Sequence, residues 1–190
     1  MVSIKEVVNE AEKYYNDSVR KIRIIDTMYK KETGKSYHPD TRLVQFDEIL
    51  QAILLTEALI DGSFHRREMM FIDLIAKHGN LLKAIAQETG GELQMTWTDI
   101  AAMDEETQMK LAGILPRILE KRSSDFVAAM AKVDKDTPSI DVLKDLTVNI
   151  GHICACLSTF DGETGRKESK AAGSMISALL YQRWKAILDS

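Results

Sequence analysis

The sequence predicts an all-α protein: a helical bundle in which one helix–Asp-Gly–helix unit occurs twice, preceded by a long N-terminal helix. Apolar residues recur with a period of 3.5 to 3.6 residues along most of the chain, and no stretch alternates apolar and polar residues as a half-buried strand does. The 190 residues include only three prolines and ten glycines. Since these two residue types are the main interrupters of helices, we expect helices to hold nearly all of the chain.

The composition is that of a globular protein with a sizeable core, at 45% hydrophobic and 28% charged residues. The formal net charge of −4 lacks the basic excess that phosphate contacts require, so we expect no nucleic-acid partner. No apolar run approaches the roughly 20 residues that cross a bilayer, and the first residues lack the apolar centre of a signal peptide. We therefore expect a cytoplasmic protein without membrane insertion.

The two cysteines, Cys154 and Cys156, lie two positions apart in an apolar segment. On a helix this spacing turns them roughly 200° away from each other, so they cannot form a disulfide together. We expect buried free thiols in a reducing compartment, which agrees with a cytoplasmic location.

Residues 1–34 form the first predicted element, a long helix. Ser3 and Glu6 have the spacing of a capping box, and Gly34 suits the position just after a helix. An apolar stripe runs along this helix, with Ser18 in its one polar slot, through Ile4, Val8, Ala11, Tyr15, Ile22, Ile25 and Tyr29. The stripe has two interpretations. It is a seam that pairs with another long helix, in this chain, in a second copy or in a protein partner, or it is a face packed on the body of its own domain.

Residues 35–190 form the predicted helical domain, with repeat one at 43–78, connecting helices at 80–133 and repeat two at 138–188. An offset of 100 positions aligns the apolar residues of the repeats, and Asp61-Gly62 with Asp161-Gly162. Such agreement at one period indicates an internal duplication. In the connecting region Pro116 removes a backbone donor, so we expect a kink or a break there.

Each repeat contains Asp-Gly, five residues and Glu, and turn chemistry explains this pattern without a ligand. Glycine takes the left-handed conformation that ends a helix, and aspartate accepts hydrogen bonds from exposed amides of the turn. The glutamates, Glu68 and Glu168, fall where a carboxylate reaches back to the start of the next helix.

The alternative interpretation is a metal site. In repeat one, Glu57 and Asp61 share a helix face and Glu68 follows on the next helix, so their carboxylates suit Ca²⁺, Mg²⁺ or Mn²⁺. Repeat two has Leu157 in place of Glu57, which leaves Asp161 and Glu168 as a weaker pair. An EF-hand is excluded, because Leu157 and Thr159 would occupy ligand positions.

The segment Leu-Thr-Glu-Ala-Leu-Ile-Asp61-Gly62-x5-Glu68 resembles the signature of the TerB-like helical domains, named for a tellurite-resistance protein. The resemblance covers roughly residues 43–78, with a weaker echo at 143–180. It implies a fold of two similar helical halves, a link to tellurite or chemical stress, and metal binding through Asp61, Glu68, Asp161 and Glu168. The chain departs from the family where Arg66-Arg67 and Arg166-Lys167 replace acidic residues, which favours an anionic partner over a metal.

We find no nucleophile–base pattern and no phosphate-binding glycine loop in the sequence. The leading hypothesis is therefore a non-catalytic TerB-like module of a bacterial stress-response or regulatory assembly, acting through protein–protein contacts. The alternative hypothesis is a divalent-metal-binding protein linked to tellurite or chemical stress resistance.

Overall fold

The computed structural model describes residues 3–60, 64–90, 95–136, 142–161 and 166–189, with the backbone alone for residues 60, 132, 134–136, 161, 166–169, 171 and 172. All regular structure in these ranges is helical, which confirms the predicted all-α class. The elements are α1 (Ile4–Thr33), α2 (Pro39–Ile60), α3 (Arg66–Ile75), α4 (Leu81–Thr89), α5 (Trp97–Ala101), α6 (Glu105–Asp136), α7 (Val142–Asp161) and α8 (Arg166–Leu188). Among the described helices, none has the length and apolar character needed to span a membrane.

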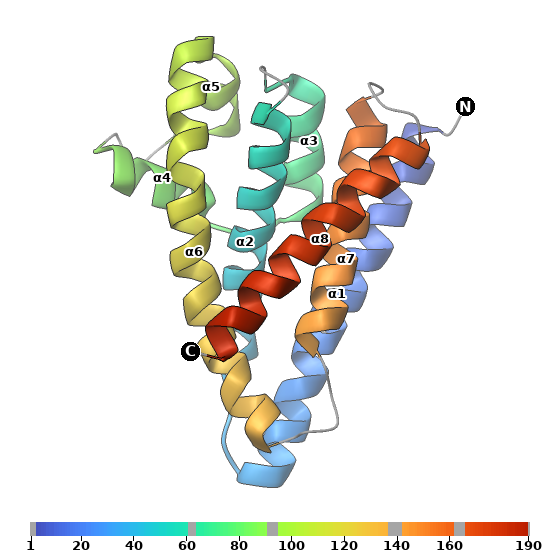
Figure 1. The fold of residues 1–190 in the computed structure, drawn as a ribbon, viewed down its shortest axis with the longest axis vertical. Coiled ribbons are helices and arrows are strands. Elements are labelled where there is room, and N and C mark those ends of the chain that lie inside the picture. Colours follow the sequence, from blue (N-terminus) through green and yellow to red (C-terminus); the bar gives the residue numbers. More distant parts are fainter. Residues whose placement is uncertain (1–2, 61–63, 91–94, 137–141, 162–165, 190) are drawn as a thin grey trace.

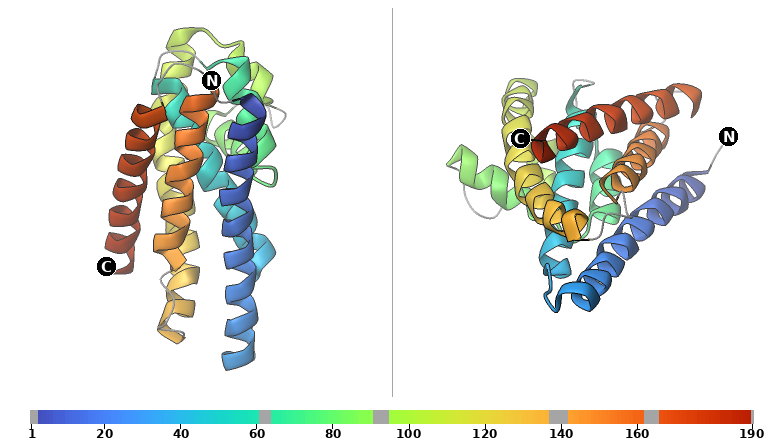
Figure 2. Two further views of the ribbon diagram at one scale, coloured as in Figure 1. Left: turned by 90° about the vertical axis from the view of Figure 1, so that its right-hand side faces the viewer. Right: turned by 60° about the horizontal axis from the view of Figure 1, so that its bottom comes forward.

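The long helices α1, α7 and α8 lie side by side with α7 in the middle (Figure 2). α2 packs along α6, and the C-terminal part of α8 reaches α6 (Figure 1). At that end Trp184 is fully buried, with its ring 5.7 Å from that of Phe126. α8 is therefore held by α7 along its length and by α6 at its end.

The predicted boundaries of the first helix are confirmed. Glu6 N–H donates to Ser3 Oγ, the Ser3 amide donates to the Glu6 carboxylate, and Gly34 ends α1 with a φ of 72°. The stripe of α1 packs against α7 of the same chain, in a hydrophobic core that extends to Trp184. Of the two interpretations, packing on its own domain is the one observed, although Ile4 remains 54% exposed.

Pro116 does not break its helix. α6 continues through it from Glu105 to Asp136, so of the predicted kink or break, the break is wrong. Solvent exposure of Pro116 and of its neighbour Arg117 leaves room for the ring on the outer side of the helix.

The predicted repeats agree in where their second helices begin, at Arg66 and Arg166, but their helices pack differently. α7 contacts α8 along its length, whereas α2 contacts α3 at only a few points and packs mainly on α6. The turns that contain Gly62 and Gly162 lie outside the described residues.

The backbones of α7 and α8 approach each other closely at Gly151 and Gly173. A Cβ atom added to Gly151 would lie 2.6 Å from the carbonyl oxygen of Gly173, and one added to Gly173 would overlap the carbonyl oxygen of Gly151. Ser177 Oγ donates to the Thr147 carbonyl oxygen at 2.7 Å across the same contact. Only glycine allows the two backbones to approach this closely.

Replacing Gly173 with alanine should therefore lower the free energy of unfolding by about 2 kcal/mol, because the new methyl group overlaps backbone that cannot move alone. Urea unfolding measures this loss. The matched control is Gly113→Ala in α6, where a Cβ meets no atom within 4 Å and helix propensity should raise stability by about 0.5–1 kcal/mol. Equal effects of the two substitutions would contradict the packing described.

Candidate functional site

The carboxylates predicted to bind metal have other partners where the structure describes them. Glu57 Oε1 accepts a hydrogen bond from Ser158 Oγ of α7 at 2.7 Å. Glu68 is buried and accepts from the His65 amide at 2.8 Å, as the turn-and-cap interpretation predicts. Asp61, and the side chains of Asp161 and Glu168, lie outside the described residues. Among described side chains, no three of His, Cys, Asp or Glu are grouped to hold a metal ion, and the metal site stays a prediction.

The prediction that the two cysteines are buried and do not form a disulfide is confirmed for Cys154 and Cys156. Burial, and then the charge of nearby Glu57, raises the pKa of the Cys154 thiol well above its usual range. Because the thiolate is the reactive form, Cys154 is poorly suited to act as a nucleophile at neutral pH.

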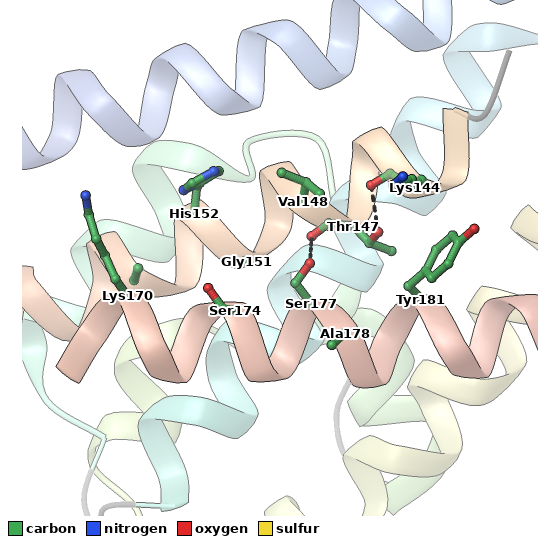
Figure 3. A pocket seen from close by; sticks show the side chains of 11 residues that line it. Lys144, Thr147, Val148, Gly151, His152, Lys170, Ser174, Ser177, Ala178 and Tyr181 are labelled. Atoms are coloured by element: carbon green, nitrogen blue, oxygen red, sulfur yellow. Dashed lines mark hydrogen bonds between the residues drawn. The ribbon is translucent and has the colours of Figure 1, made fainter. Parts of the chain in front are cut away.

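The first candidate site is a groove between α7 and α8, shown in Figure 3 and here called the α7–α8 groove. It has a volume of about 370 Å³. Its floor is made of small or apolar residues. Because the two helices approach each other closely, a channel lined by these residues remains between them. The lining residues are Lys144, Thr147, Val148, Gly151, His152 and Ala155 of α7 and Lys170, Ser174, Ser177, Ala178 and Tyr181 of α8.

The charged side chains of the α7–α8 groove lie at its two ends, Lys144 at one and Lys170 beside His152 at the other (Figure 3). The imidazole of His152 is half-buried and stacks on Tyr14 of α1, with ring centroids 4.3 Å apart. The sequence placed His152 among apolar residues, but the structure places it at the rim of this groove.

The second candidate site lies on the other side of α8 and is here called the α2–α6–α8 groove. It has a volume of about 360 Å³ and is mostly apolar. Glu57 and Arg183 are its ionisable lining residues, and Arg183 forms an ion pair with Glu120 at 3.4 Å. The other lining residues are Ile53, Thr56, Pro116, Leu119, Ile176, Leu179 and Leu180.

Between the two grooves, α8 exposes an apolar ridge, defined by Met175, Ala178 and Leu179. Met175 is 62% exposed and Leu179 is 60% exposed, one helical turn apart. Single exposed apolar residues are common on protein surfaces, but two adjacent ones beside an apolar groove are typical of a binding surface.

A cluster of buried polar side chains on α2 serves the fold. Asp47 Oδ2 accepts hydrogen bonds from Tyr15 of α1 at 3.0 Å and from the His78 amide at 2.7 Å. Gln51 donates to the Ala76 carbonyl oxygen at 2.7 Å and thereby holds the same α3–α4 connection. Burial, opposed by these hydrogen bonds, raises the pKa of Asp47 to about 6. Since both partners of Asp47 are structural groups, we assign this perturbed carboxyl to stability and not to catalysis.

Comparison of the chain with protein-family models, with curated proteins and with solved structures found no match. The resemblance to TerB-like domains therefore stays a prediction from the motif. Sequence reasoning missed both grooves, and the available signal was the run of small residues Gly151, Ala155, Gly173 and Ser177 at four-residue spacing.

The raised pKa of Asp47 predicts how stability depends on pH. The folded state prefers the neutral carboxyl, so its contribution to stability is full below about pH 4 and is lost as the pH rises to about 6. Asp47→Asn should remove this loss. Between pH 4 and pH 7 the free energy of unfolding of the variant should therefore rise by about 2 kcal/mol relative to that of the wild type. Urea unfolding at several pH values measures the difference, and a difference independent of pH would contradict the assignment.

Proposed function

We propose that the chain is a non-catalytic helical module that acts through protein–protein contacts made by α8. The observation that carries the proposal is the apolar ridge of α8, in which Met175 and Leu179 are both more than half exposed next to the α2–α6–α8 groove. Apolar side chains that are held on a rigid helix beside a groove suit a partner with a complementary apolar surface.

The partner meets a surface with polar groups at its border. Arg183, which lines the α2–α6–α8 groove, forms an ion pair with Glu120. Glu57 lines the same groove and accepts a hydrogen bond from Ser158 of α7. An apolar centre with a polar rim is the usual arrangement of a protein interface. The aliphatic centre, made by Ile176, Leu179 and Leu180, therefore supplies the contact area, and the rim sets the orientation of the partner.

A non-catalytic role agrees with the state of the ionisable groups. The pKa of the Cys154 thiol is raised by burial, and Asp47 is held by Tyr15 and by a backbone amide. The assignment to a bacterial stress-response or regulatory assembly rests on the motif Asp61-Gly62-x5-Glu68 alone. The metal-binding alternative rests on the same motif, and the described residues add nothing that favours it.

The test is a photo-crosslinking amino acid placed at Leu179 in the native host, with Met109 of α6 as the matched position. Met109 is 66% exposed, similar to Leu179, but lies away from the ridge. We expect one protein, or a second copy of the chain, to crosslink at position 179 and not at 109. The identified protein is then purified, and its affinity is measured by calorimetry.

Leu179→Asp should weaken that binding by roughly tenfold or more, since it places a charge in an apolar contact, whereas Met109→Asp should leave it unchanged. A crosslinking pattern equal at both positions, or an affinity unaffected by Leu179→Asp, would overturn the proposal.

A further inference from the structure

We infer that the α7–α8 groove binds an acidic helical segment of a partner protein, with two carboxylates about three turns apart that meet Lys144 and Lys170. This inference rests on the proposed function, because it gives the chemistry of a partner that contacts α8. It uses a different surface, on the side of α8 opposite the α2–α6–α8 groove.

The charged side chains that line the α7–α8 groove are basic. The eleven residues that line the α7–α8 groove include Lys144, Lys170 and His152 but no aspartate or glutamate. The chain as a whole carries a net charge of −4, so this lining has the opposite sign to the average surface. Complementary charge selects the partner and speeds its association, which favours a segment with carboxylates.

Lys144 and Lys170 lie about three helical turns apart along the groove. Lys170 lies at the level of Ala155, since both line the small cavity next to the groove, and Lys144 lies eleven residues before Ala155 on α7. Eleven residues of helix span about 16 Å and complete about three turns. Two carboxylates eleven residues apart on a partner helix therefore lie on one face, at the separation of the two lysines.

The floor of the groove has the shape of a channel between two helices. Between the lysines the channel is lined by Val148, Gly151 and Ala178, which leave space for the side chains of a third helix. Thr147 and Ser177 direct their hydroxyl groups to backbone carbonyl oxygens within the α7–α8 pair, so the channel wall presents mainly carbon. A helix packs by placing its ridge of side chains in such a groove between two others.

A negative side chain, that of Glu10, lies next to the groove. Glu10 of α1 lines the small cavity that also contains Lys170 and His152. Since both side chains line this cavity, the Glu10 carboxylate competes for Lys170 with a carboxylate of the partner. Glu10→Gln should therefore strengthen binding of an acidic helix, a result that a purely apolar groove would not give.

The test uses a fluorescein-labelled, alanine-rich helical peptide of about 20 residues with two glutamates eleven positions apart and leucines on the same face. Two further peptides serve as controls: one has lysines in place of the glutamates, and the other has the glutamates one turn apart. Fluorescence anisotropy with the full chain measures binding at low and at physiological salt. We expect the first peptide to bind several-fold more tightly than either control, with an affinity that falls as salt increases.

The variant Lys144→Glu/Lys170→Glu should weaken binding of the glutamate peptide by roughly tenfold and gain affinity for the lysine peptide. The matched control is Lys83→Glu/Lys110→Glu, which makes the same charge change at exposed lysines of α4 and α6. Recovery of binding with the lysine peptide shows that the reversed variant is folded.

The inference is overturned if the glutamate peptide does not bind, if its spacing has no effect, or if both double variants weaken it equally. The last result would mean non-specific charge attraction. A specific partner crosslinked at Leu179, together with no peptide binding, would overturn this inference alone and leave the proposed function standing.

Discussion

The contact between the backbones of α7 and α8 at Gly151 and Gly173 sets the position of every surface that we assign to function. Because neither residue has a side chain, the helices approach until the carbonyl oxygen of each glycine lies where a Cβ atom of the other would be. From this contact α8 extends to α6, where Trp184 packs on Phe126. A groove remains on each side of α8, and the apolar ridge of α8 lies between them.

A second constraint holds the other half of the molecule. Asp47 joins α1 to the connection between α3 and α4, and Glu48 beside it forms an ion pair with Arg122 of α6 at 3.0 Å. The buried carboxyl of Asp47 lowers the stability of the folded state when it ionises, because burial disfavours the charged form. This is the physical cause of the raised pKa of Asp47. The hydrogen bonds of Asp47 and Gln51 offset this cost, because they satisfy backbone groups that would otherwise be buried without partners. The fold thus combines one contact made of glycine with one made of polar side chains.

The sequence predicted what depends on neighbouring residues. The capping box of Ser3 and Glu6, the end of α1 at Gly34 and the return of Glu68 to the His65 amide follow from local hydrogen bonds. It did not predict which helices pack together, since the stripe of α1 suits any apolar face. Pro116 shows the same limit: its local effect is unfavourable, but α6 continues through it in the folded chain. The grooves depend on the contact of residues 151 and 173. The small residues at four-residue spacing mark the two helix faces, but they do not specify that these faces pack on each other.

The central claim is that the glycine contact positions α8 for binding, and the binding of Gly173→Ala tests it most directly. At a temperature where circular dichroism shows this variant to be folded, its affinity for the glutamate-bearing helical peptide is compared with that of Gly113→Ala. We predict that Gly173→Ala binds at least several-fold more weakly, because its α8 is displaced from α7, and that Gly113→Ala binds as the wild type does. Equal affinity of the folded Gly173→Ala variant and the wild type would contradict the account.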